Sequence, residues 1–208
     1  VVADIHGIRP AELVAFQKTG GKVVGSFCIH VPDEVVIAGG AIATGLCSGS
    51  QFWVPGGEKV LPTATCALIK ASLGARFDRT CPFFRICDLF VGETTCDGKK
   101  KAWEILAEDA PMYIMDIPQL KRPADFTKWE AEIHGYIKRI EELTGNKITA
   151  EKLHDAIVLV NNKRRALQRL NAVRKVKNVP ISGRDVLLIH QIAFYDDPAR
   201  FTQMVNKL

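Results

Sequence analysis

The chain has 208 residues, enough for one sizeable hydrophobic core or for a domain joined to a smaller unit. Hydrophobic residues make up 47% and charged residues 25%, and no apolar run approaches the roughly 20 residues of a membrane-spanning helix. No basic-then-apolar signal segment stands at the start, so we expect a cytoplasmic protein. Because the chain begins at Val1 without methionine, we expect a processed, truncated or incomplete N-terminus.

Charge, glycine and cysteine divide the chain near residue 98. Residues 1–98 hold 8 Lys and Arg against 9 Asp and Glu, whereas residues 99–208 hold 20 against 14. Thirteen of the 16 glycines and all six cysteines precede residue 99. Two kinds of structure are therefore joined in this sequence.

The first half reads as apolar strands alternating with helices, after a helical lead-in over residues 1–21. Strands are predicted at residues 22–28, 41–46, 89–93 and 112–117. Helices are predicted from Pro32, over residues 64–73 and over residues 98–107, with a loop at 54–62. The alternation predicts an α/β domain over residues 22–125, with a parallel, flavodoxin-like sheet covered on both faces.

Residues 126–208 read as an all-helical segment. Apolar residues at helical spacing predict a helix over 126–143 and a second helix that begins at Thr149 as its N-cap. Ser182 and Pro198 are expected to open two more. The second helix carries a basic run that begins at Lys163. We interpret this run as a solvated face, because no aromatic residues interleave with it as a nucleic-acid surface would require.

The cysteines need a chemical explanation, since cytosolic thiols stay reduced and rarely form structural disulfides. They are Cys28, Cys47, Cys66, Cys81, Cys87 and Cys96. No CxxC pair occurs, so any metal ligands must converge from separate loops. The histidines form no HxxxH or HExxH pattern, and no GxGxxG or GxxxxGK[ST] motif is present. We therefore do not expect this chain itself to bind a dinucleotide or hydrolyse ATP.

The positions of three cysteines favour a ligand site beyond the carboxyl ends of the strands, where ligands of doubly wound sheets collect. Cys47 follows the second predicted strand, and Cys66 and Cys96 stand at predicted helix starts. Unpaired N–H groups at a helix start favour the thiolate, which is the form that binds iron. Cys81, in a loop, could reach the same crevice. Cys28 and Cys87 lie within apolar stretches and read as small buried hydrophobes.

Several segments together carry a resemblance to a known family. They are GSFCIHVPDE (25–34), GLCSGSQ (45–51), LPTATCALIK (61–70), TCPFF (80–84) and VGETTCDGKKK (91–101). They resemble the 2-hydroxyacyl-CoA dehydratase family, which includes benzoyl-CoA reductase subunits and the double-cubane cluster proteins. The helical part is similar too, so the resemblance covers essentially the whole chain. It implies two α/β domains and helical segments that hold an oxygen-sensitive iron–sulfur cluster.

The resemblance also implies a redox activity. In this family a separate ATP-hydrolysing iron–sulfur activator delivers single electrons at very low potential. In the dehydratases the electron makes a ketyl radical from the acyl-CoA thioester, which lets the 2-hydroxyl leave; in the double-cubane branch, two cubanes joined by a sulfide perform difficult reductions. By motif, Cys66 and Cys96 match the cluster cysteines, of a [4Fe-4S] or double-cubane cluster. Cys47 and Cys81 are the expected additional ligands, and they place the chain closest to the double-cubane branch.

The chain departs from the family pattern in its length. Family members are about twice as long, and a second α/β domain with further ligands follows the helices. Because no cysteine follows Cys96, we expect the N-terminal half of a subunit, whose remaining ligands come from a missing second domain or another chain. The expected partners are the activator, a related subunit in a homo- or heterodimer, and an acyl-CoA substrate. No catalytic residue can be named from the sequence.

A different class of protein remains as the alternative. The cysteines could be structural, in a zinc-binding or interaction module without enzymatic activity. Colourless protein with stoichiometric zinc would favour that hypothesis. Neither a membrane nor a nucleic acid is expected as a partner.

Overall fold

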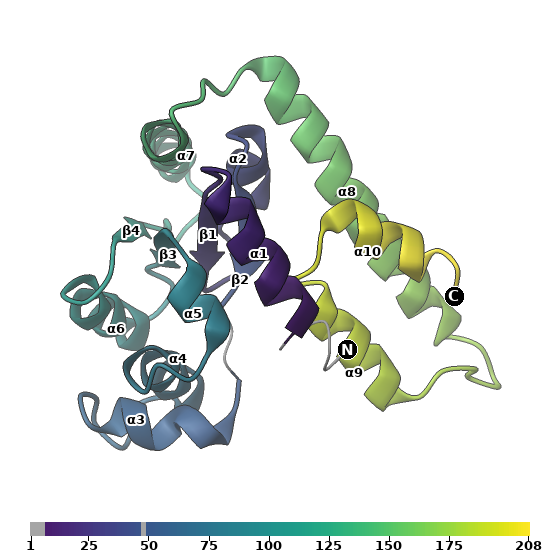
Figure 1. The fold of residues 1–208 in the computed structure, drawn as a ribbon, viewed down its shortest axis with the longest axis horizontal. Helices are drawn as coiled ribbons and strands as arrows, with labels where there is room; N and C mark the ends of the chain where they lie inside the picture. Colours follow the sequence, from purple (N-terminus) through teal and green to yellow (C-terminus); the bar gives the residue numbers. More distant parts are fainter. Residues whose placement is uncertain (1–6, 47–48) are drawn as a thin grey trace.

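The computed structural model describes residues 7–46 and 49–208. A four-stranded sheet lies in its first part, with all strands parallel and in the order β2-β1-β3-β4 (Figure 1). The strands are β1 (Val23–Ser26), β2 (Ile42–Gly45), β3 (Leu89–Glu93) and β4 (Met112–Met115). This is the order of the first four strands of a flavodoxin-like sheet. The predicted α/β class with a parallel sheet is confirmed.

Strands β1 and β3 form the middle of the sheet. Val24 of β1 stands in register between Ala43 of β2 and Leu89 of β3. All five residues of β3 are buried. Parallel strands that are covered on both faces consist of nearly continuous apolar residues, which is why the sequence pattern predicts these strands.

Helices cover both faces of the sheet. One face carries α1 (Arg9–Lys18), α4 (Ala67–Phe77), α5 (Pro82–Ile86) and α6 (Asp97–Ala107). The other face carries α2 (Asp33–Ala38) and α7 (Pro123–Thr144). Phe90 and Trp103 lie in the core of the first face, and Leu89 and Tyr136 lie in the core of the second. Each face of β3 is thus sealed by a separate apolar cluster.

The remaining helices form an arm beside the sheet, drawn in green to yellow in Figure 1. They are α8 (Ala150–Val173), α9 (Gly183–Ile192) and α10 (Pro198–Val205). A third apolar cluster, with Ala166, Val186 and Phe201 among its members, holds them together. Thr149 and Ser182 accept backbone N–H hydrogen bonds at the starts of α8 and α9, which confirms the predicted N-cap at Thr149 and the predicted helix start at Ser182. Among the described residues, no helix is both long and apolar enough to cross a membrane.

Contacts from α8 and from the segment after α9 attach the arm to the carboxyl end of the sheet. The backbone N–H of Gly45, the last residue of β2, donates to the carbonyl oxygen of Phe194 at 2.7 Å. Arg164 of α8 forms an ion pair with Glu34 of α2, with 2.6 Å between Nη1 and Oε1. The arm therefore stands over the edge at which ligands of such sheets collect.

The loop predicted at residues 54–62 is wrong in its first part. A 3-10 turn, η2 (Gln51–Trp53), leads directly into a short helix, α3 (Val54–Glu58). The glycines here allow close contact between helices: a β-carbon on Gly57 would overlap the carbonyl oxygen of Lys70, and one on Gly74 would overlap that of Trp53. Proline and glycine, which indicate a loop in the sequence, here allow α3 to lie directly against the backbone of α4.

Candidate functional site

Cys66 and Cys96 lie at the starts of two neighbouring helices. Cys66 is the N-cap residue of α4 and Cys96 that of α6, and both have non-helical backbone conformations. Their carbonyl oxygens accept the first helical hydrogen bonds, each at 3.1 Å. Both residues are exposed, and neither is in a disulfide. The structure thus places both cysteines at helix starts, each one position before the first residue of its helix.

The two helix starts adjoin each other through Gly98. A β-carbon built on Gly98, two residues after Cys96, would lie 2.8 Å from Cδ1 of Ile69 and 3.8 Å from Cγ2 of Thr65. Thr65 immediately precedes Cys66 in the chain. The absence of a side chain at residue 98 therefore lets the loop of Cys66 approach the loop of Cys96.

A buried ion pair connects the end of β3 to the helix start that carries Cys96. Glu93, the last residue of β3, is fully buried and pairs with Lys99 in the first turn of α6. Its Oε1 also accepts a hydrogen bond from Thr95 Oγ1 at 2.9 Å, and its carbonyl oxygen accepts one from Trp103 Nε1 at 2.9 Å. Its other carboxylate oxygen, Oε2, is buried with no hydrogen-bond partner among the described residues. Such a carboxylate fixes the position of the lysine.

Cys28 also acts on Lys99. Burial lowers the pKa of Lys99, but the Glu93 carboxylate and the Cys28 thiol together raise it by more, so the pKa of Lys99 is above the ordinary value for lysine. The ammonium group therefore stays charged between a carboxylate and a sulfur atom.

Cys28 differs from its predicted place in the apolar core. It is half-buried, follows β1 by two residues, and lines a cavity at the carboxyl end of the sheet. The apolar residues beside Cys28 in the sequence led to the prediction of a buried side chain. The signal that could have revealed it is the end of β1 at Ser26, because residues just past a central strand reach the ligand edge.

Cys87 packs in the core as predicted. A β-carbon on Gly25 of β1 would lie 2.7 Å from its Sγ, and burial raises the pKa of the Cys87 thiol. Its place against the middle strand leaves it little freedom to reach a ligand.

Cys81 is the N-cap residue of the short helix α5 and packs against the first apolar cluster. Burial raises the pKa of the Cys81 thiol, while hydrogen bonds from the backbone of Phe84 and Phe83 act to lower it. It lines a cavity of about 550 Å³, to which Leu46 and Gly49 also contribute.

Cys47, predicted as a ligand, lies outside the described residues. In the described part of the chain, no three His, Cys, Asp or Glu side chains lie close enough to hold a metal ion.

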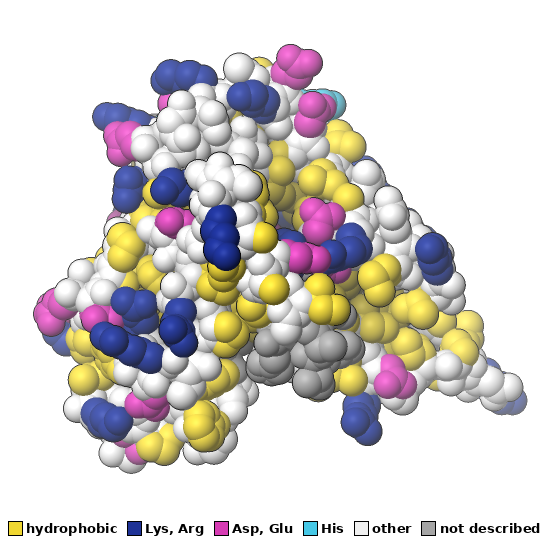
Figure 2. Space-filling model, in the orientation of Figure 1, with side chains coloured by type: hydrophobic (Ala, Val, Ile, Leu, Met, Phe, Trp, Pro, Cys, Tyr) yellow, Lys and Arg dark blue, Asp and Glu magenta, His cyan; other side chains and the backbone are white. Residues whose placement is uncertain are grey.

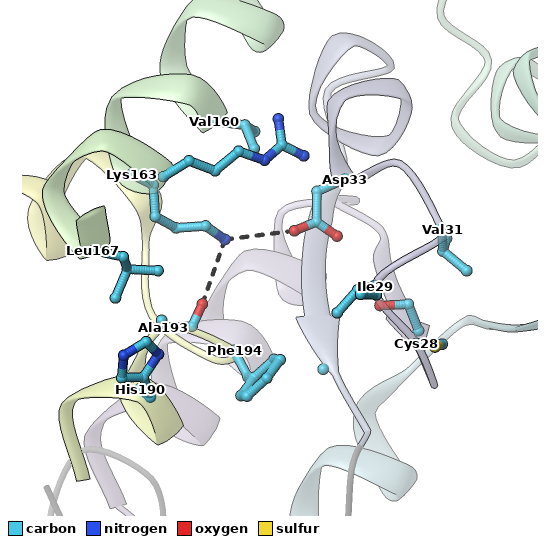
Figure 3. Close-up of a pocket in the computed structure, with 13 residues that line it drawn as sticks. Cys28, Ile29, Val31, Asp33, Val160, Lys163, Leu167, His190, Ala193 and Phe194 are labelled. Atoms are coloured by element: carbon cyan, nitrogen blue, oxygen red, sulfur yellow. Dashed lines mark hydrogen bonds and ion pairs between the residues drawn. The ribbon is translucent and has the colours of Figure 1, made fainter. Parts of the chain in front are cut away.

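A second cavity, of about 270 Å³, lies between the ends of β1 and β2 and the helices α8 and α9 (Figure 3). Cys28 and His190 line it from opposite sides. Lys163 extends across it toward Asp33, with 3.5 Å between Nζ and Oδ2, and Nζ donates to the carbonyl oxygen of Ala193 at 3.4 Å. Burial raises the pKa of Asp33, against the opposing charge of Lys163.

This cavity corrects the interpretation of the basic run as a wholly solvated face. The Lys163 side chain is only 16% exposed and pairs with α2, as does that of Arg164. Periodicity on α8 alone could not reveal this, because the acidic partners lie more than a hundred residues earlier in the chain. The first two residues of the run instead hold the arm against the sheet.

Comparison with known proteins assigns the chain to a family. The profile of the 2-hydroxyglutaryl-CoA dehydratase D-component matches residues 28–208, which run from Cys28 through the arm. The chain belongs to this family. The match confirms the resemblance found in the cysteine motifs.

Named relatives are subunits of dehydratases and of a reductase. The protein named “Putative dehydratase subunit YjiM” of Escherichia coli K12 is 40% identical over 174 residues, which cover 83% of this chain and 45% of the relative. The (R)-phenyllactyl-CoA dehydratase beta subunit of Clostridium sporogenes is 22% identical over 198 residues, covering 92% and 51%. A benzoyl-CoA reductase subunit of Thauera aromatica is 22% identical over 173 residues, covering 81% and 44%. The chain spans about half the length of these relatives.

Proposed function

We propose that this chain is the cluster-bearing part of an iron–sulfur enzyme subunit of the 2-hydroxyacyl-CoA dehydratase type. The observation that carries the proposal is the pair of exposed thiols, Cys66 and Cys96, at adjoining helix starts on the ligand edge of the sheet. We assign both as cluster ligands, with Cys47 and Cys81 as additional ones. Residues 22–125 would form the cluster-binding domain, and residues 126–208 would lead to a second α/β domain.

The donor chemistry of these residues fits an iron–sulfur cluster. Iron in such clusters takes thiolate ligands, and the helix-start N–H groups beside Cys66 and Cys96 favour thiolates. The ammonium group of Lys99 adds positive charge at the edge, as a site for several thiolates requires. When bound, the cluster would supply single electrons at low potential for dehydration or reduction of an acyl-CoA thioester. Cys66 and Cys96, with Cys47 and Cys81, would hold it at the carboxyl end of the sheet.

Partners complete the proposal. The relatives are named as subunits, and the chain spans about half their length, so further ligands and the acyl-CoA site would come from outside this chain. Electrons would come from an ATP-dependent iron–sulfur activator in the cytoplasm.

Figure 2 shows apolar side chains gathered over the arm, and the exposed residues there include Leu187 and Met204, at 59% and 55% exposure. Such a surface supports association with a related subunit.

The test is the metal content of protein that is purified and reconstituted without oxygen. We expect several iron and acid-labile sulfide atoms per chain, with a broad absorption band near roughly 400 nm as iron–sulfur clusters show. Cys66→Ser and Cys96→Ser should each lose most of this iron, whereas Cys87→Ser, a buried control, should keep it. Full iron content in both ligand variants would contradict the assignment. Colourless protein with stoichiometric zinc would favour the structural-cysteine alternative.

A further inference from the structure

Cys28 occupies the point of the sheet where the strand order reverses. From β1 the chain passes to β2 on one side, and from β2 it returns to β3 on the other. Parallel sheets bind ligands in the crevice at this reversal. The backbone N–H of Phe27 donates to Val91 of β3 at 3.1 Å, and Val31 N–H donates to the Cys28 carbonyl at 3.3 Å. Strand pairing and a tight turn thus fix Cys28 in the crevice.

Lys99 joins Cys28 to the helix that begins at Cys96. Its side chain is 16% exposed, it forms an ion pair with the fully buried Glu93, and the Cys28 thiol is close enough to raise its pKa. Burying two charges costs free energy that an isolated pair seldom recovers. The side chains of Glu93 and Cys28 thus approach Lys99 from two elements, the end of β3 and the turn after β1.

The same short stretch brings in Cys66. Gly98 precedes Lys99 and lies against Thr65, the neighbour of Cys66. The helix start that carries Cys96 is therefore flanked by the loop of Cys66, through Gly98, and by Cys28, through Lys99. These three thiols come from separate loops. Among the described residues they do not form a single-ion site, which needs all its ligands on one atom. A cluster distributes its thiolates over several iron atoms, so it requires wider spacing between them.

We propose that Cys28 is a further cluster ligand, next to Cys66 and Cys96, and that Lys99, held by Glu93, is its positioning residue. This inference rests on the proposed iron–sulfur function. It adds to the site a residue whose apolar sequence context predicts a buried hydrophobe. It also gives a role to an ion pair that the other two ligands do not explain.

The ligand role is tested with Cys28→Ala and the matched control Cys87→Ala, both reconstituted without oxygen. Iron and sulfide per chain are measured, with the electron paramagnetic resonance spectrum of the reduced protein. We expect Cys28→Ala to lose at least half of the iron, or to keep it with a changed spectrum, while Cys87→Ala matches the wild type. Wild-type iron and spectrum in Cys28→Ala would overturn the inference and leave the proposed function intact. An iron-free wild type would instead overturn the proposed function.

The positioning role is tested by the reduction potential. Lys99→Met should lower the midpoint potential, because a nearby cation stabilises the more negative reduced form. Lys101→Met removes an exposed cation from the same helix and should leave the potential unchanged. Since Lys99→Met leaves Glu93 unpaired, the double variant Lys99→Met/Glu93→Gln is measured as well, with the same direction expected. Lys99→Arg should restore most of the potential. A potential that Lys99→Met and the double variant leave at the wild-type value would overturn the positioning role.

Discussion

Glu93 is the residue on which the ligand edge depends most. It has no exposed surface, yet its side chain pairs with Lys99 and accepts a hydrogen bond from Thr95, and its carbonyl oxygen accepts one from Trp103. A buried charge is tolerated only when it is paired and hydrogen-bonded. The residue therefore couples the end of β3 to the first turn of α6, where Cys96 lies.

Loss of this carboxylate should destabilise the fold. Glu93→Gln leaves Lys99 without its ionic partner, and breaking a buried pair on one side costs about 3 kcal/mol. Urea unfolding of the metal-free protein measures the change. The control is Asp97→Asn, which removes a fully exposed partner of Lys100 and should leave stability unchanged. Equal effects of the two substitutions would contradict the role given to Glu93.

At this scale the sequence predicts some cysteine positions and misses others. Helix-start signals place Cys66 and Cys96, because N-cap positions follow from local sequence. Cys28 is missed, since its flanking residues are apolar and only the end of β1 reveals its exposure. The Glu93–Lys99 pair is also missed, because charge at helical spacing does not show which acid becomes buried.

Among the elements, the α3–α4 contact holds the start of α4 in place. Gly57 and Gly74 allow the two backbones to touch, and Lys70 of α4 pairs with Glu58 of α3 at 2.6 Å. The sequence predicts the strands and the long helices because their periodicity is local. The sequence does not predict α3, because this short helix is stabilised by its contact with α4 rather than by a local pattern.

A methyl group in this contact should separate the helices. Gly74→Ala would overlap the carbonyl of Trp53, and overpacking of this kind costs about 2 kcal/mol. Thermal unfolding compares it with Gly183→Ala, where a β-carbon meets no atom within 4 Å. The control should unfold at an equal or higher temperature, because alanine restricts the unfolded chain. A Gly74→Ala protein as stable as the control would contradict the close contact.

In the whole molecule, the first and last helices are tied together by Glu12 and Arg200. Arg200 donates from Nη1 to Glu12 Oε1 at 2.6 Å and from Nη2 to Oε2 at 2.9 Å. These hydrogen bonds, with a further one from Arg9, lower the pKa of Glu12 to about 2, although burial opposes the shift. Such long-range pairs connect the arm to α1, and no local pattern predicts them.

This pair should make stability depend on acid pH. Because the pKa of Glu12 is lower in the folded chain than its ordinary 4.5, the stabilisation is complete above about pH 4.5 and is lost as the pH falls toward 2. Urea midpoints measured between pH 5 and pH 2 should fall more steeply for the wild type than for Glu12→Gln. Parallel curves would show that the pair contributes nothing, as exposed ion pairs often do.

The central claim is that this edge of the sheet holds an iron–sulfur cluster. The most direct test is the iron and acid-labile sulfide content per chain of protein purified and reconstituted without oxygen. We predict several atoms of each, retained in Cys87→Ser and largely lost in Cys66→Ser and Cys96→Ser. Iron-free protein, or iron that survives both ligand substitutions, would contradict the claim.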